Sequence, residues 1–234
     1  MLRSIVFPSF LSPIRMGLLP GAALAALLFA TNPSAQAQFA PPSPGTQVHD
    51  PAALKPPAGA RVAIVEFEDM ECPDCARANP LLREAAAKYN IPWVRHDFPL
   101  PFHPWSMQAA VNARWFDTKS KKLGDEYRDA VFAAQTSLGE DPNLLRQFTE
   151  KFAADRKIAL PFAIDPQGKL QAEVKADYAL GQRIGIEHTP TIWVVTANSK
   201  GAPFVEVVDR TKLFQLIDQA LEDTKGAVTR TAHK

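Results

Sequence analysis

Residues 67–80 read FEDMECPDCARANP, and this stretch carries the only two cysteines of the 234-residue chain, Cys72 and Cys75. Such a pair suits a redox couple, half of a zinc site, or a structural cross-link. A cross-link closing so short a loop removes little entropy from the unfolded chain, which disfavours a stabilising role. A zinc site needs four ligands, and the chain has neither a second CxxC nor a closely spaced histidine pair. The redox couple is therefore the favoured interpretation.

The residues around the cysteines predict a buried strand followed by a helix. Residues 62–67 (VAIVEF) form a nearly continuous apolar run, which is typical of a strand buried on both faces in a parallel sheet. Residues 73–89 have helical composition, and Pro73 suits the first helical turn. Cys72 would then lie at the helix N-terminus, where free N–H groups and the helix dipole favour a thiolate. Cys75 would follow one turn later and be more buried.

The rest of the chain predicts an α/β domain interrupted by helices. A second strand at residues 93–97 completes a strand–helix–strand unit, which should be a parallel crossover. Apolar residues at spacings of three and four then predict four amphipathic helices, at residues 105–117, 123–138, 143–154 and 169–184. Asp141-Pro142 and Asp165-Pro166 are predicted helix starts. The last predicted elements are a hairpin of strands 191–196 and 203–208 and a helix at 212–223.

The first 37 residues have the layout of a secretory signal peptide. An apolar run at residues 16–30 follows two arginines, and Ala35-Gln36-Ala37 offers small residues for cleavage. Because the run is shorter than the roughly 20 apolar residues that span a bilayer, we expect cleavage rather than anchoring. Residues 38–60 are rich in proline and predict an extended linker. Residues 225–234 predict a short basic tail.

The charge balance excludes some classes of partner. The chain has 26 basic and 25 acidic residues, and the signal segment contains two of the basic ones, Arg3 and Arg15, and no acid. The mature chain would therefore carry 24 basic against 25 acidic residues. A nearly neutral protein lacks the electrostatic footprint of a nucleic-acid binder, so we expect no nucleic-acid partner.

A CxxC at a helix start after a buried strand resembles the thioredoxin superfamily, and three further positions agree. Pro80 is similar to the proline that kinks the active-site helix of that family, Glu66 to its buried acid, and Thr189-Pro190 to its cis-proline loop. The helical block resembles that of the DsbA-like branch, periplasmic thiol–disulfide oxidoreductases with a helical insertion. This resemblance implies an α/β thioredoxin fold with an inserted helical domain. Its parts would be a first half at residues 61–100, the insertion at 101–185 and a second half at 186–224.

The resemblance implies a role for each matching residue. Cys72 would be the nucleophile and Cys75 the resolving cysteine. Glu66 would share protons with Cys75, unless it reaches water at the edge of the sheet. Pro190, if cis, would expose the backbone of Thr189 to an extended substrate peptide. Pro73 and Asp74, which lie between the cysteines, would form the environment of the active site.

The implied function is that of an exported, periplasmic protein thiol–disulfide oxidoreductase, with the oxidase direction favoured. The alternatives are a periplasmic disulfide reductase or isomerase, a glutathione-dependent transferase or isomerase, and a non-catalytic metal-binding module. We expect thiol-bearing or disulfide-bearing client proteins, a membrane redox partner that resets the cysteine pair, and neither cofactor nor metal. The segment before residue 61 is too short for a dimerisation domain, which predicts a monomer.

Acidic residues crowd the cysteines and suggest a mild oxidant. Five acids and no base occur between residues 66 and 74: Glu66, Glu68, Asp69, Glu71 and Asp74. DsbA-like oxidants typically have histidine where this chain has Asp74. Since like charge disfavours a thiolate, we expect the pKa of Cys72 to be lowered less than in those proteins.

Overall fold

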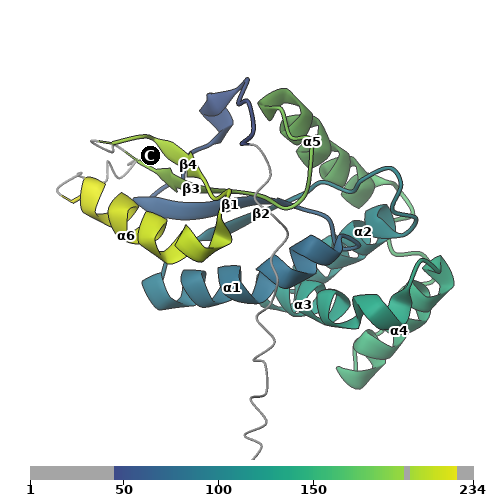
Figure 1. Cartoon of the computed structure of the whole chain (residues 1–234). Helices are drawn as coiled ribbons and strands as arrows, with labels where there is room; N and C mark the ends of the chain where they lie inside the picture. Colours follow the sequence, from purple (N-terminus) through teal and green to yellow (C-terminus); the bar gives the residue numbers. More distant parts are fainter. Residues whose placement is uncertain (1–44, 198–200, 226–234) are drawn as a thin grey trace, which may run out of the picture. The chain divides into compact units, whose positions relative to one another are not determined.

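A four-stranded mixed sheet organises the fold (Figure 1). The computed structural model describes residues 45–197 and 201–225, which belong to one compact unit. The sheet order is β2-β1-β3-β4. Strand β1 (Val62–Glu68) pairs in parallel with β2 (Trp93–Asp97) and antiparallel with β3 (Thr191–Thr196), which forms a hairpin with β4 (Phe204–Glu206). The predicted parallel crossover and the predicted hairpin are both confirmed.

Helices lie on both faces of this sheet, and several of them form the long connection between β2 and β3. Within the described residues they are η1 (Pro51–Ala53), α1 (Pro73–Tyr89), α2 (Ser106–Asp117), α3 (Lys121–Leu138), α4 (Pro142–Asp155), α5 (Lys169–Ile184), η2 (Arg210–Lys212) and α6 (Leu213–Asp223). Helices α1 and α6 lie on one face of the sheet and α5 on the other (Figure 1). The α/β class and the helical insertion are therefore confirmed.

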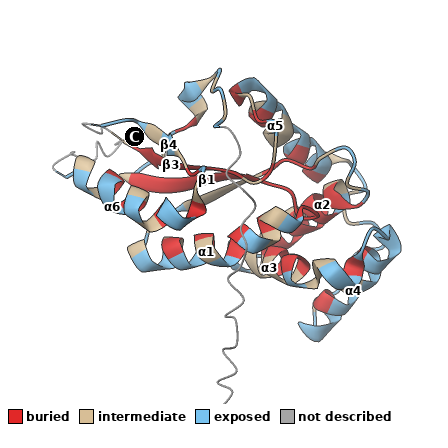
Figure 2. Ribbon diagram, in the orientation of Figure 1, coloured by how far each residue is buried: buried red, intermediate tan, exposed pale blue. Residues whose placement is uncertain are grey.

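Alternation along β1 separates two cores. Val62 and Ile64 face α1 and α6, whereas Ala63 and Val65 pack toward α5. Every residue of β1 is buried (Figure 2). Because side chains alternate with a period of two, Glu66 points to the same face as Ile64 and so lies beneath α1.

A third core holds the insertion together and includes both cysteines. Phe116, Tyr127 and Phe152 pack with ring centroids 4.7 to 5.2 Å apart, which joins α2, α3 and α4. Cys72 and Cys75 belong to the same buried cluster. The cysteine pair therefore lies where the sheet domain meets the insertion.

The predicted bounds of α5, residues 169–184, are confirmed, but the predicted helix start at Asp165-Pro166 is wrong. Asp141 caps α4 as predicted, since its side chain accepts the N–H of Asn143 at 2.9 Å. Helix α5, in contrast, begins at Lys169 and not at Asp165-Pro166. Gly168 precedes it with a φ of 68°, so the chain still turns after Pro166. Asp165 nevertheless accepts the N–H of Gln171 at 2.8 Å, so it serves the helix from outside.

The proline-rich segment before β1 packs more closely than an extended linker would. Leu54 is buried in the core beneath α5, and the N–H of His49 donates to the carbonyl of Ile184 at 2.8 Å. Leu54, an apolar residue among the prolines, thus packs this segment against the domain. The predicted signal segment, residues 1–37, lies outside the described residues, as do residues 226–234 of the tail. In the described part, no helix has the length and apolar character needed to cross a membrane.

Replacing Gly181 by alanine should destabilise the fold. A Cβ atom there would lie 2.6 Å from ring atoms of Phe98 and 3.1 Å from the ring of Phe67. Overpacking of this kind typically costs about 1–3 kcal/mol, more than the gain of up to about 1 kcal/mol from removing a helical glycine. Urea unfolding should show the loss for Gly181→Ala. Ala179→Ser, at an exposed position of the same helix, should change stability by less than about 0.5 kcal/mol. Equal or higher stability of the glycine variant would refute this packing.

Candidate active site

Helix α1 begins directly after Cys72 and gives the two cysteines different surroundings. Pro73 occupies the first helical position, and Cys72 is the N-cap residue with extended backbone, φ −73° and ψ 120°. Both cysteines are free thiols. Cys72 keeps 8% of its surface exposed, whereas Cys75, one turn into the helix, has none. Of the two cysteines, only Cys72 therefore has surface that another molecule can reach.

The two thiols also differ in acidity. The pKa of Cys72 is lowered to about 6, chiefly because the thiol of Cys75 hydrogen-bonds to it, while burial opposes the shift. Burial raises the pKa of Cys75 well above its ordinary value, and the hydrogen bond to Cys72 adds to the rise. At neutral pH the site therefore holds a thiolate at Cys72 and a thiol at Cys75.

The loop before β3 meets Cys72 from the other half of the domain. The Thr189–Pro190 peptide bond is cis, and the Sγ of Cys72, when protonated, donates to the carbonyl of Thr189 at 3.3 Å. Thr191 closes the same loop, since its hydroxyl donates to the carbonyl of His188 at 2.6 Å. The structure thus brings together Cys72, Thr189 and Pro190, which the sequence placed more than 110 residues apart.

Glu66 lies buried beneath the cysteines. Only 1% of its surface is exposed, so it does not reach water at the edge of the sheet. Its Oε2 accepts the indole N–H of Trp93 at 2.9 Å, while Oε1 has no hydrogen-bond partner among the described residues. Burial raises the pKa of Glu66 well above its usual range, and the charge of Glu68 adds to the rise. Glu66 also acts electrostatically on Cys75. A neutral carboxyl that can exchange protons near Cys75 fits these surroundings.

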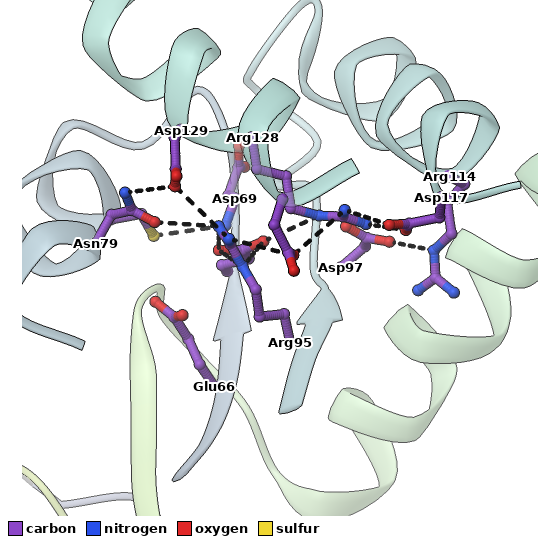
Figure 3. Close-up of polar contacts among 12 residues, drawn as sticks. Glu66, Asp69, Asn79, Arg95, Asp97, Arg114, Asp117, Arg128 and Asp129 are labelled. Carbon is purple, nitrogen blue, oxygen red and sulfur yellow. Dashed lines mark hydrogen bonds and ion pairs between the residues drawn. The ribbon is translucent and has the colours of Figure 1, made fainter. Parts of the chain in front are cut away.

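A buried network of charges occupies the space between the sheet and the insertion (Figure 3). Arg95 on β2 pairs with Glu68 at 2.7 Å, and both side chains are at most 3% exposed. Arg128 of α3 lies 3.7 Å from Glu68 and pairs with Asp117 at 2.8 Å. Two buried arginines thus neutralise an acid that would otherwise lie uncompensated close to Glu66. Sequence reasoning missed both, although an arginine within a strand was a visible signal.

Of the five acids near the cysteines, Glu68 and Asp74 have arginine partners and Asp69 has hydrogen-bond donors, which corrects the expectation that local negative charge is uncompensated. Asp69 accepts the N–H of Leu100 at 2.7 Å and pairs with the ring of His103 at 2.7 Å. Asp74 pairs with Arg210, at 2.6 and 2.7 Å from its two oxygens. The partners come from distant parts of the chain, so a local count of charges could not reveal them.

In residues 45–197 and 201–225 no three His, Cys, Asp or Glu side chains are grouped to hold a metal ion.

Gln135 ties the insertion to the active-site loop. From α3, its Nε2 donates to the carbonyls of Met70 at 2.7 Å and of Cys72 at 3.1 Å. These bonds hold the residues that lead into α1. No pattern in the sequence marks Gln135, because one glutamine on an amphipathic helix has nothing to distinguish it.

The acidity of Cys72 should be measurable directly. Absorbance at 240 nm reports thiolate, and the wild-type protein should titrate near pH 6, well below the pH 8.5 or so of a free cysteine. Cys75→Ala should raise this midpoint, because it removes the hydrogen bond that chiefly stabilises the thiolate. The matched variant Cys72→Ala should show no transition near pH 6, since burial raises the pKa of Cys75. A wild-type midpoint above pH 8 would contradict this account of the site.

Removing the buried carboxyl should stabilise the protein in a pH-dependent way. Burial in the folded protein raises the pKa of Glu66, so the folded state binds the proton more tightly than the unfolded chain does. The free energy of unfolding should therefore fall as the pH rises above the pKa that Glu66 has in the unfolded chain. Glu66→Gln should remove this loss, so its thermal midpoint should exceed the wild-type midpoint by more at pH 8 than at pH 5. Glu84→Gln, at an exposed position of α1, is the control and should show little difference between the two pH values. A constant offset across the range would mean that Glu66 does not titrate in this way.

Solved structures of other proteins share the fold described above. The structure of Wolbachia pipientis α-DsbA1 superposes with a TM-score of 0.55, at 18% identity, over 78% of this chain and 96% of that one. Pseudomonas aeruginosa DsbA2 gives a TM-score of 0.52 at 24% identity, over 70% and 91% of the two chains. At these identities the similarity establishes the fold.

Comparisons of sequence give a family and a partial relative. The Na(+)/H(+) antiporter NhaA 3 of Salinispora tropica is 27% identical over 143 residues, which are 60% of this chain and 21% of the antiporter. The chain thus spans less than a quarter of the length of the curated relatives that it matches. The sequence model described as thioredoxin matches residues 58–211, more than half of the chain. The chain therefore belongs to the thioredoxin family and has the fold of its DsbA-like branch.

Proposed function

We propose that this protein is a thiol–disulfide oxidoreductase that exchanges disulfides with client proteins through Cys72 and Cys75. The observation that carries the proposal is the difference between the two sulfurs. Cys72 keeps 8% of its surface exposed and is acidic, with a pKa of about 6, whereas Cys75 is fully buried and its pKa is raised. The sulfur of Cys72 is thus suited to bond with a client, and that of Cys75 to close the internal disulfide that is exchanged.

In the oxidase direction, a client thiolate attacks Sγ of Cys72 in the Cys72–Cys75 disulfide. The bond between the two protein sulfurs breaks, and Cys75 leaves with the electron pair and takes up a proton. A second client thiolate then attacks the client sulfur of the mixed disulfide and releases Cys72 as a thiolate. The client loses two electrons and gains a disulfide, and the cysteine pair is reduced to the dithiol.

The surrounding residues have separate roles in this proposal. Glu66 supplies or removes the proton at Cys75, on which it acts electrostatically from a buried position. Thr189, next to Pro190, offers backbone to an extended client beside Cys72, because its carbonyl lies 3.3 Å from that sulfur. Pro73 ends the extended segment and starts the helix, so that Cys72 takes the N-cap position.

The acidity of Cys72 supports the oxidase direction. A stable thiolate stabilises the reduced form, which makes the disulfide a better oxidant. The comparable pKa is about 7 in thioredoxin and about 3.5 in DsbA. A value of about 6 for Cys72 therefore favours a milder oxidant than DsbA. The reductase, isomerase, glutathione-dependent and metal-binding alternatives have no observation of their own in their favour.

We further propose that the protein works in the periplasm as a monomer and is reset by a membrane redox partner. The support for export is the layout of residues 1–37 as a signal peptide, and the support for a monomer is the proline-rich composition of residues 38–60, which is not that of a folded dimerisation domain. Reoxidation requires an acceptor of two electrons, which in a test tube can be oxidised glutathione.

Refolding of a reduced, unfolded client with two or more disulfides tests the proposal. The oxidised protein should restore client activity in the presence of oxidised glutathione, and Cys72→Ser should lose this activity. Cys75→Ser cannot form the internal disulfide, so with oxidised glutathione it should instead accumulate mixed disulfides of Cys72 with glutathione or the client, visible on a non-reducing gel. Acceleration of refolding that survives the Cys72→Ser, Cys75→Ser double change would refute disulfide exchange. An equilibrium with glutathione as oxidising as that of DsbA would refute the milder potential.

A further inference from the structure

Arg210 reaches Asp74, between the two cysteines, from the opposite end of the chain. It lies in η2, just before α6, and 136 residues separate it from Asp74. Its Nη2 lies 2.6 and 2.7 Å from the two carboxylate oxygens, and its Nη1 donates to the carbonyl of Asp74 at 3.1 Å. The guanidinium thus holds both the side chain and the backbone of a residue within the CPDC motif.

This contact is stronger than an ordinary surface ion pair. The side chain of Arg210 is only 8% exposed, so water screens its charge weakly. Arg77, the other partner of Asp74, reaches one carboxylate oxygen at 2.9 Å and is 42% exposed. Arg210 is therefore the principal counterion of Asp74, and Arg77 provides a natural comparison.

The charge of Asp74 bears directly on the redox centre. Asp74 lies two residues after Cys72 in the first turn of α1, where a bare carboxylate would repel a thiolate. Its ion pair with Arg210 cancels that repulsion. Arg210 also acts electrostatically on Glu66, whose ionised form it favours. One cation from the C-terminal half thus acts on Asp74, between the cysteines, and on Glu66, which precedes them in the sequence.

Other charged groups around the centre have partners of their own. Asp69 and Glu71 of the preceding loop are held by His103 and by the backbone N–H of Trp105. Glu68 is paired with Arg95. A change at Arg210 should therefore be felt first at Asp74.

We propose that Arg210 is a positioning residue of the redox centre, which neutralises Asp74 and so keeps the thiolate of Cys72 stable. The inference rests on the proposed function, because it concerns the poise of the same cysteine pair. It assigns part of the control of that poise to a residue far from the CxxC motif in the sequence.

The test measures two quantities in Arg210→Gln: the pKa of Cys72 from absorbance at 240 nm, and the equilibrium constant with glutathione. The pKa of Cys72 should rise by roughly half a unit to one unit, which corresponds to a roughly threefold to tenfold less stable thiolate. Because the reduced form is then less stable, the disulfide should become less oxidising by about the same factor. Circular dichroism and a thermal scan establish that the variant is folded.

Three controls separate charge from structure. Arg210→Lys keeps the charge but not the two-point geometry, so it should leave both quantities close to wild type. Arg77→Gln removes the exposed partner of the same carboxylate and should shift the pKa of Cys72 by less than half as much. In an Asp74→Asn background, Arg210→Gln should lose more than half of its effect, because the charge that it neutralises is gone.

Two results would overturn the inference. One is an unchanged Cys72 titration and glutathione equilibrium in folded Arg210→Gln. The other is a shift of the Cys72 pKa in Arg210→Lys as large as that in Arg210→Gln, which would mean that packing and not charge causes the effect. Failure of the proposed function is a separate outcome, since the Cys72 titration needs no client. A protein that fails to oxidise clients but still shows the Arg210→Gln shift would support Arg210 and refute the function.

Discussion

The start of α1 is the constraint on which the rest of the site depends. Pro73 begins the helix, Cys72 becomes its N-cap residue, and Cys75 is carried one turn into the interior. Burial and the hydrogen bond between the sulfurs then separate their acidities, with a pKa of about 6 at Cys72 and a raised pKa at Cys75. A helix that began one residue later would take from Cys72 the backbone N–H groups of the helix N-terminus, which also lower its pKa.

Such a helix start needs support from three other parts of the fold. The sheet places Glu66 beneath Cys75, because β1 alternates its side chains between the two faces. The insertion contributes Gln135, which holds the carbonyl of Cys72 at 3.1 Å. The second half of the domain contributes Thr189 beside Cys72 and Arg210 on Asp74. The cysteine pair is thus a junction of all three parts.

Buried charge is the main cost of this arrangement. Arg95 and Arg128 lie in the interior with Glu68 and Asp117, where an ion pair contributes little stability beyond what its desolvation costs. Their value lies in compensation, since an unpaired acid close to Glu66 would be expensive. Among the described residues, Glu66 accepts the indole N–H of Trp93 and forms no ion pair, and burial raises its pKa. The network therefore leaves one carboxyl near the cysteines able to stay neutral.

Local features of the sequence were sufficient to predict most of the elements and the place of the cysteine pair at a helix start. The bounds of α1, β2 and α5 agree with their predictions, with the one exception that α5 lacks the expected start at Asp165-Pro166. Periodicity and capping act between neighbours along the chain, so these elements are readable from it. The pairing of Asp74 with Arg210 is different in kind, because it joins residues 136 apart and depends on how η2 docks against α1. Neighbouring residues are enough to predict the cysteine pair and the helix that follows it. The charges around the pair follow from the folded structure, because counterions are residues that lie close in space and not in sequence.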